Sequence, residues 1–196
     1  MGASFVGLPP CYQIPREGDL MITTERTILR PWRDEDLDPF AAMLADPEVQ
    51  ADAGGPVDRD AAAAKMARYR AAHDRLSYTR WVVTDHAGAF LGYVGIMPID
   101  TWHPRSPNVE IGWRLTRGSW GFGIATEAAR ASLIDGFTRC GLDEVLSYTA
   151  ATNHRSQAVM RKLGLQREET LDFTAAYDGH SWSGLVWVAR PDHFRP

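Results

Sequence analysis

Apolar residues recur along the chain with two periods, and each period predicts a different kind of element. The helical spacing of three to four residues occurs in segments around 37–44, 58–74, 123–139 and 153–163. Apolar runs bounded by turn residues predict strands at 23–29, 78–84, 89–97, 108–115, 144–150, 166–173 and 182–189. We therefore expect an α/β or α+β fold, in which about four helices cover one mixed sheet of about six or seven strands.

Residues at the ends of these segments support the boundaries. Asp58 and Asn153 stand where a helix N-cap is expected, because their side chains can accept from unpaired backbone N–H groups. Gly164 stands where the last helix should stop. The prolines between 98 and 107 predict a loop between two strands.

Composition and charge exclude several classes of protein. Apolar residues make up 44% of the 196 residues and charged residues 23%, which is typical of a soluble globular domain. The net charge of −4 argues against a large nucleic-acid surface. No apolar run approaches the ~20 residues that span a bilayer. Two cysteines, Cys11 and Cys140, are too few for a disulfide framework or a zinc cluster, so no metal is expected.

The chain divides into residues 1–20, expected to form an N-terminal arm, and residues 21–196, expected to form a single domain. The arm lacks the charged segment and apolar core of a signal peptide. We therefore expect a cytoplasmic protein without a membrane partner. The edges of an open sheet can pair between subunits, so a monomer or a homodimer is expected.

The segment from Glu110 to Ala125 predicts a binding site for an anion. It contains an apolar strand, then a turn with Gly121 and Gly123, then the start of a long alanine-rich helix. Glycine allows a tight turn and a close approach of a ligand to the backbone. The unpaired N–H groups and positive dipole end of the following helix attract an anion such as a phosphate. A third glycine and a Lys-Ser/Thr pair are missing, so neither a dinucleotide fingerprint nor a Walker loop is present.

Three ordered motifs give the chain a family resemblance. They are Glu110-Ile111-Gly112-Trp113, then Trp120-Gly121-Phe122-Gly123-Ile124-Ala125-Thr126-Glu127-Ala128, then Asn153 to Leu165 with Ser156, Val159 and Lys162-Leu163-Gly164. Together with Thr27 to Trp32, they resemble the GNAT superfamily of acyl-CoA-dependent N-acetyltransferases. Within it, the chain is similar to the RimJ/RimL-like ribosomal-protein N-terminal acetyltransferases. The resemblance implies a GNAT-like fold over 21–196, with a twisted, mostly antiparallel sheet and a central parallel pair of strands that splay apart.

The resemblance also implies where acetyl-CoA binds, as the acyl donor. Backbone N–H groups of Gly121, Phe122, Gly123, Ile124, Ala125 and Thr126 would bind the pyrophosphate. Trp120 stands where the superfamily has Arg or Gln, and it is expected either to mark this branch or simply to pack against the helix. The pantetheine arm would lie between strands 108–115 and 144–150, bonded to backbone near Trp113, Arg114 and Leu115, as in peptide β-augmentation.

Glu110 is the candidate general base. Alternation places Glu110, Gly112 and Arg114 on one face of their strand, opposite Ile111 and Trp113. An acidic residue in an apolar strand is unusual, and a carboxylate can take the proton of an attacking amine directly or through one water. The alternative is a structural ion pair with Arg114 or another arginine.

Two residues of the last helix have expected roles with simpler alternatives. Asn153 is expected to contact the pantetheine or the pyrophosphate, or to act only as a helix N-cap. Many superfamily members use a tyrosine of this helix as general acid, and here the aligned residue is Met160, which cannot donate a proton. We therefore expect Ser156 to hydrogen-bond the departing thiolate, directly or through water. The alternative is a local bond from Ser156 to the backbone.

Candidate residues for the acceptor site are aromatic or polar. Aromatic walls and carboxylates suit an amine and its neighbours, although aromatic rings more commonly form the core. The candidates are Trp32, Tyr78, Trp102, His103, Asp172 and Tyr177, with Asp178 as a further carboxylate.

The predicted activity is acetyl transfer from acetyl-CoA to a primary amine, by direct attack in a ternary complex. The acceptor is a protein N-terminus, a free amino acid or polyamine, or an amino-sugar antibiotic. Two other classes remain open: a non-catalytic or weakly active acyl-CoA sensor, favoured by Met160, and a plain nucleotide-binding domain that uses the same glycine turn. Glu110 favours the enzyme over the sensor.

Overall fold

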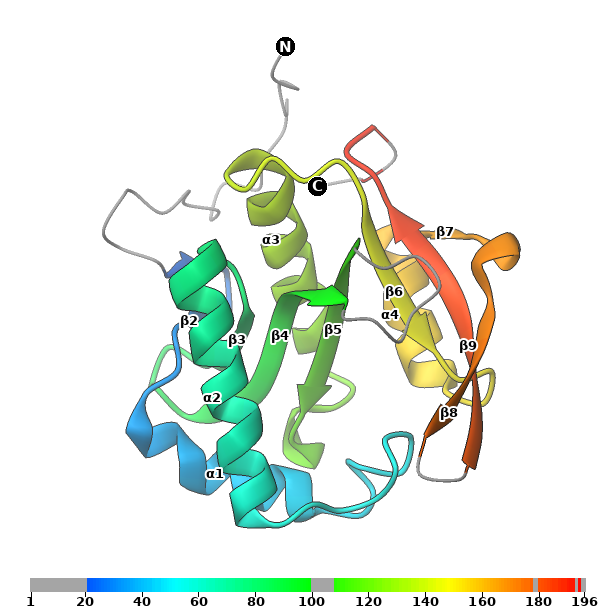
Figure 1. Ribbon diagram of the computed structural model, residues 1–196. Coiled ribbons are helices and arrows are strands. Elements are labelled where there is room, and N and C mark those ends of the chain that lie inside the picture. Colours follow the sequence, from blue (N-terminus) through cyan, green and yellow to red (C-terminus); the bar gives the residue numbers. More distant parts are fainter. Residues whose placement is uncertain (1–20, 100–107, 178–179, 193, 195–196) are drawn as a thin grey trace.

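The computed structural model describes residues 21–99, 108–177, 180–192 and 194. These residues form nine strands and four α-helices (Figure 1). The strand order across the sheet is β1-β2-β3-β4-β5-β6-β9-β7, and β8 pairs with β9 as a hairpin. The expected mixed sheet is therefore confirmed, with two more strands than the upper estimate from sequence.

The first half of the sheet is an antiparallel ladder. Its strands are β1 (Ile22–Thr23), β2 (Ile28–Arg30), β3 (Arg80–Thr84), β4 (Phe90–Ile99) and β5 (Asn108–Leu115). The register pairs Tyr93 with Arg114, and Met97 with Glu110. Cross-strand partners project from the same face of a sheet, so these four side chains lie on one face.

The second half joins the first through the sheet's parallel pair. Its strands are β6 (Val145–Thr149), β7 (Gln166–Arg167), β8 (Phe173–Tyr177) and β9 (His180–Ala189). The register of β5 and β6 joins Glu110 to Leu146, and a single further bond runs from Ser147 Oγ to Ile111 O at 3.0 Å. The two strands therefore separate beyond Glu110, which confirms the expected splayed pair.

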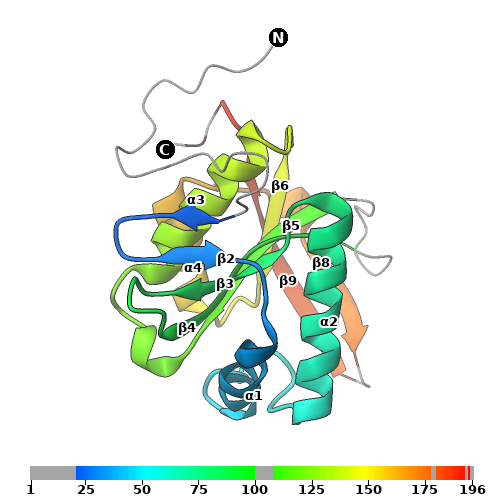
Figure 2. The ribbon, with the colours of Figure 1, turned by 90° about the vertical axis from the view of Figure 1, so that its left-hand side faces the viewer.

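Helices cover both faces of the sheet, and each face has its own apolar core (Figure 2). On one face lie α1 (Leu37–Ala45) and α2 (Arg59–Leu76), and their core includes Phe40, Tyr69 and Tyr93. On the other lie α3 (Ile124–Thr138) and α4 (His154–Leu163), packed over Ile111 and Leu115. The alternation expected along 108–115 is confirmed by this division.

The extra strands arise where local hydrogen bonds interrupt a predicted strand. The segment 23–29 is a hairpin, because Thr24 and Thr27 bond each other through backbone and hydroxyl groups across a turn. The segment 166–173 contains β7, a 3-10 turn at Glu169–Leu171 and the start of β8. β4 continues through Pro98 to Ile99, where a loop was expected; β3 pairs with β4 only as far as Gly95, so Pro98 has one neighbouring strand.

Candidate active site

Two adjoining pockets lie where β5 and β6 separate. The first, the turn pocket, has a volume of about 330 Å³, and the second, the strand pocket, about 200 Å³. The turn pocket is lined by Glu48, Val49, Asp52, Trp113 to Leu115, Ser119 to Gly121, Gly123 to Thr126, Asn153, Arg155, Ser156, Ala158, Val159 and Lys162. The strand pocket is lined by Asp52, Arg80, Tyr93, Glu110 to Arg114, Ser147 to Ala150, Asn153, Ser156 and Met160. Most of the predicted coenzyme residues, with Glu110 and Ser156, are thus brought together.

The glycine turn presents a row of backbone donors to the turn pocket. Gly121 and Gly123 have φ angles of 83° and 80°, a left-handed conformation that residues with a Cβ rarely adopt. Within the described residues, no backbone carbonyl accepts from the N–H groups of residues 121–126; the first such bond runs from Glu127 N to Gly123 O. These unpaired donors lie at the positive end of the α3 dipole, an arrangement that binds anions.

A second set of contacts fixes this turn to the start of the sheet. Arg26 donates to Phe122 O at 2.6 Å and to Glu127 Oε2 at 2.6 Å, and Thr24 donates to Glu127 Oε1 at 2.6 Å. Burial raises the pKa of Glu127, but the hydrogen bonds from Thr24 and Arg26 outweigh it and lower that pKa. Glu127 of the second motif therefore positions the turn.

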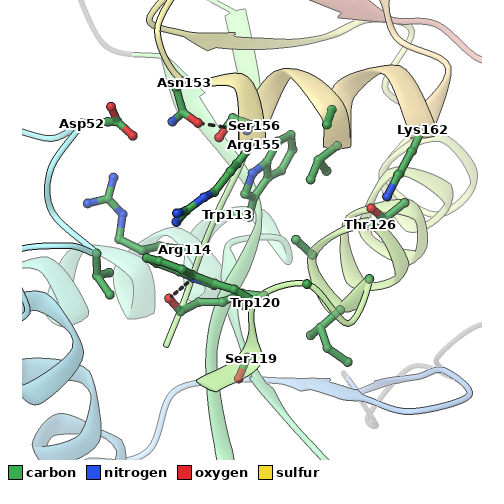
Figure 3. Close-up of a pocket in the computed structure, with 18 of the residues that line it drawn as sticks. Asp52, Trp113, Arg114, Ser119, Trp120, Thr126, Asn153, Arg155, Ser156 and Lys162 are labelled. Carbon is green, nitrogen blue, oxygen red and sulfur yellow. Dashed lines mark hydrogen bonds between the residues drawn. The ribbon is translucent and has the colours of Figure 1, made fainter. Parts of the chain in front are cut away.

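Helix α4 supplies polar and cationic groups on the opposite side of the turn pocket (Figure 3). Asn153 caps the helix, since its Oδ1 accepts from Ser156 N at 3.0 Å. The Arg155 guanidinium lies 4.4 Å from the centroid of the Trp120 ring, as in a cation–π contact. Trp120 also donates from Nε1 to Leu115 O at 3.0 Å, so its ring forms a wall of the pocket as well as packing against the core.

Glu110 lies in the strand pocket and forms an ion pair with Arg80. Arg80 begins β3 and is buried; it donates to the Glu110 carboxylate, to Gly95 O, and to Glu110 O at 3.1 Å. Gly112 allows this arrangement, because a Cβ built there would lie 2.9 Å from Arg80 Nη2. The ion pair that was the alternative for Glu110 is therefore present, with Arg80 as the partner. The pair does not close the site, since 18% of the Glu110 side chain stays exposed to the pocket.

Tyr148 and Ser156 bring hydroxyl groups to the strand pocket. Tyr148 of β6 lines the pocket and hydrogen-bonds Glu110; burial, and then the Glu110 charge, raise the pKa of Tyr148. Ser156 is half-buried and lines both pockets, and none of the described residues hydrogen-bonds its Oγ. The local backbone bond that was the alternative for Ser156 is thus not formed. Met160 is buried in the same wall.

The predicted acceptor residues whose side chains the structure describes do not line either pocket. Trp32 is buried among the α1 and α2 side chains. Its indole donates to Arg80 O and so helps to fix the backbone at Arg80. Tyr78 packs on the α3 core, and Asp172 pairs with Arg167 and Val186 N. The Tyr177 side chain is not described, and Trp102, His103 and Asp178 lie outside the described residues.

Several residues of the site were not predicted, and their sequence signals are weak. They are Asp52, Arg80, Tyr93, Tyr148, Arg155 and Lys162. Arg155 and Lys162 stand within the third motif, seven residues apart, which is two turns of one helical face. Arg80 is a charged residue at the start of a strand whose five residues are all buried, and its charge in that strand is its one distinguishing feature. Tyr93 resembles any core aromatic residue.

The described residues contain neither a metal-binding cluster nor a helix suited to a membrane. No group of three or more His, Cys, Asp or Glu residues among them could hold a metal ion. None of the helices in that part of the chain combines the length and apolar character that a membrane crossing needs.

The chain is similar in sequence to known acetyltransferases. The family model for an acetyltransferase (GNAT) domain matches residues 26–166. An uncharacterised Bacillus subtilis protein, YkkB, is 28% identical over 152 residues, which cover 76% of this chain and 87% of that protein. The FsC-acetyl coenzyme A-N(2)-transacetylase of Aspergillus fumigatus is 36% identical over 95 residues, covering 46% of this chain and 40% of that enzyme.

Solved structures show the same fold at low sequence identity. An acetyltransferase of Agrobacterium tumefaciens superposes with a TM-score of 0.73 at 22% identity, covering 97% of this chain and 99% of that one. The ribosomal L7/L12 α-N-protein acetyltransferase RimL, in complex with coenzyme A, has a TM-score of 0.71 at 16% identity. The match covers 87% of this chain and 97% of that one.

The fold, the unpaired donors of the glycine turn and the family model together define the class. The chain belongs to the GNAT family of acetyltransferases. It is an acetyl-CoA-dependent N-acetyltransferase, and its structural neighbours include the ribosomal-protein acetyltransferases.

Proposed function

We propose that this enzyme acetylates a primary amine by direct attack within a ternary complex, with Glu110 as general base. The observation that supports this proposal is the position of Glu110, which lies in the strand pocket beside the turn pocket, with a carboxylate that Arg80 holds and that stays partly exposed. An amine must lose a proton to attack a carbonyl, and a fixed carboxylate accepts it directly or through one water.

Acetyl-CoA would fit the turn pocket. Its pyrophosphate would bind the backbone N–H groups of residues 121–126, with Arg155 and Lys162 of α4 as nearby cations. Its pantetheine amides would pair with β5 near Trp113, Arg114 and Leu115, because the splay leaves this part of the strand without a ladder partner on the β6 side. When bound, acetyl-CoA supplies the thioester carbonyl on which the amine acts.

Ser156 is the hydroxyl that we assign to the departing thiolate. Its Oγ is not engaged by another described residue and lies at the boundary of the two pockets. Tyr148 is a second donor in the strand pocket, but it already hydrogen-bonds Glu110. The comparison of Ser156→Ala with Tyr148→Phe separates the two: slower thiol release in Ser156→Ala supports the assignment, and normal release in Ser156→Ala with slow release in Tyr148→Phe transfers the role to Tyr148.

The proposal is tested by thiol release from acetyl-CoA with a panel of peptides, amino acids, polyamines and aminoglycosides. Acceptor-dependent release with an N-acetylated product supports it. Binding of acetyl-CoA without release for any acceptor would instead favour the sensor, which Met160 at the usual tyrosine position makes the second candidate. Equal binding of ATP would favour the nucleotide-binding alternative.

A further inference from the structure

The strand pocket contains an arginine that forms no ion pair with a described residue. Arg114 lies on the Glu110 face of β5 and lines both pockets. Its Nη1 is buried and has no hydrogen-bond partner among the described residues. Asp52 lines the same pockets from an exposed loop, and Figure 3 shows the Arg114 guanidinium on its side of the pocket, but the two form no ion pair. Buried cationic donors without partners are costly and rare in native structures.

Arg80, in the same pocket, has partners for its donors. Arg80 gives its donors to the Glu110 carboxylate and to two backbone carbonyls. Glu110 is thereby committed to Arg80 and does not neutralise Arg114. The Arg114 guanidinium, which has no partner among the described residues, is therefore available to a ligand.

Tyr93 shows the effect that these positive charges have on a neighbouring group. It lies opposite Arg114 in the β4–β5 register, lines the strand pocket, and is 6% exposed. Burial raises the pKa of Tyr93, but the charges of Lys65, Arg114 and Arg80 outweigh it and lower that pKa to about 8, with a hydrogen bond to Tyr69 in the same direction. Lys65 of α2 contributes to this shift but lines neither pocket.

We propose that the strand pocket binds amine acceptors that carry a carboxylate, with Arg114 as the group that binds it. The proposal rests on the function proposed above and adds the class of acceptor. Guanidinium and carboxylate form charge-assisted, often bidentate hydrogen bonds, which match the unused Arg114 donors. Polyamines and aminoglycosides carry further positive charges, which Arg114 would repel.

The spacing along β5 fits a compact acceptor. Glu110 and Arg114 are four residues apart, so their Cα atoms are separated by about 13 Å of extended strand. Both side chains line the same pocket of about 200 Å³, so one small molecule bound there can contact both. An amine near Glu110 and a carboxylate near Arg114 can therefore belong to one amino acid, either as its α-carboxylate or as the side chain of an acidic N-terminal residue.

Four acceptors of similar size distinguish binding of the α-carboxylate from binding of the side-chain carboxylate. Glutamate carries both carboxylates, glutamine only the α-carboxylate, isoglutamine only the side-chain carboxylate, and glutaminamide neither. We expect kcat/KM for at least one of the first three to exceed that for glutaminamide by about tenfold or more, the value of one or two charged hydrogen bonds. The preferred member of the set identifies which carboxylate is bound.

Variants of Arg114 connect the preference to this residue. Arg114→Met should remove the discrimination by raising KM for the carboxylate acceptors, and Arg114→Lys should restore part of it. The KM values are compared at saturating acetyl-CoA, because Arg114 also lines the turn pocket, and Arg161→Met, at an exposed position of α4 outside both pockets, should behave as wild type. Equal or better use of glutaminamide by the wild type, or discrimination that survives in Arg114→Met, overturns the proposal.

A binding experiment keeps this proposal separate from the proposed activity. If none of the four amines is acetylated, the N-acetyl form of each is titrated into the protein saturated with coenzyme A. Tighter binding of the N-acetyl carboxylates, lost in Arg114→Met, supports the anion site although the catalytic proposal has failed for these amines. Absence of such a difference overturns the anion site, whereas acetylation of neutral or cationic amines alone overturns it and leaves the proposed activity intact.

Discussion

Two buried arginine–carboxylate pairs in this sheet have the same chemistry and different surroundings. Asp36 accepts from both terminal nitrogens of Arg30 at 2.7 Å and from Arg33 N at 2.7 Å, and its side chain is 3% exposed. Glu110 accepts from Arg80 and Tyr148, and it lines a pocket with an unmatched cation nearby. The pairing itself therefore does not separate a structural carboxylate from a candidate base; the space beside the carboxylate does.

The largest expected effect is on stability, at the buried Arg30–Asp36 pair. Asp36→Ala leaves Arg30 buried without its partner and should lower the free energy of unfolding by about 3–5 kcal/mol. Chemical denaturation measures this change, and the fraction that remains folded should keep its kcat. A loss below about 1 kcal/mol would show that the Arg30–Asp36 pair is not the closed structural element that the comparison assumes.

Glu127, a half-buried carboxylate paired with an exposed arginine, should give a smaller effect on stability. Glu127→Gln weakens the bonds from Thr24 and Arg26, and we expect a loss of about 1–2 kcal/mol, since Arg26 is 46% exposed and solvent screens it. The pKa of Glu127 is lowered in the folded state, so this stability is present above the unfolded pKa and is lost as pH falls through the folded one. Denaturation at several pH values should show the wild type and the variant converging in acid.

The position of Arg80 can be disturbed without removing a charge. Gly112→Ala places a Cβ 2.9 Å from Arg80 Nη2, so the guanidinium must move and the Glu110 carboxylate with it. We expect turnover to fall about tenfold, because small displacements of catalytic groups are costly. Gly118→Ala, where an added Cβ meets no atom within 4 Å, is the matched control. Equal turnover of both variants would argue against a positioned Glu110.

The smallest signal is the ionisation of one tyrosine. A tyrosinate should appear near pH 8 in an ultraviolet titration, since the pKa of Tyr93 is lowered to about 8. Tyr93→Phe should remove this step. Arg114→Met should move the step to higher pH, because a neighbouring positive charge that favours the tyrosinate is gone. A first tyrosine step near the ordinary value of 10 in the wild type would show that the positive field of the strand pocket is weaker than inferred.

The sequence predicted what depends on neighbours along the chain. The glycine turn, the Asn153 cap and the alternation around Glu110 are set by residues within a few positions of one another. The partner of Glu110 was not predictable in this way, because Arg80 is 30 residues away and reaches it only through the β3–β4–β5 register.

The acceptor site was the part that the sequence located least well. Trp32 and Tyr78 are aromatic residues of the core. Their residue type alone did not show whether they line a pocket or pack in the core. Arg114 was placed on the correct face of β5, but its lack of a partner is a property of the whole surrounding shell of side chains. Such a property has no local signal in the sequence.

The most direct test of the account is the pH dependence of turnover in Glu110→Gln, measured together with acetyl-CoA binding. Glutamine keeps the size of the side chain and removes its ability to take a proton. We expect kcat to fall at least tenfold, about 1.4 kcal/mol of transition-state stabilisation, while the dissociation constant of acetyl-CoA changes little. Turnover that matches the wild type across the pH range would contradict the assignment of Glu110 as the base.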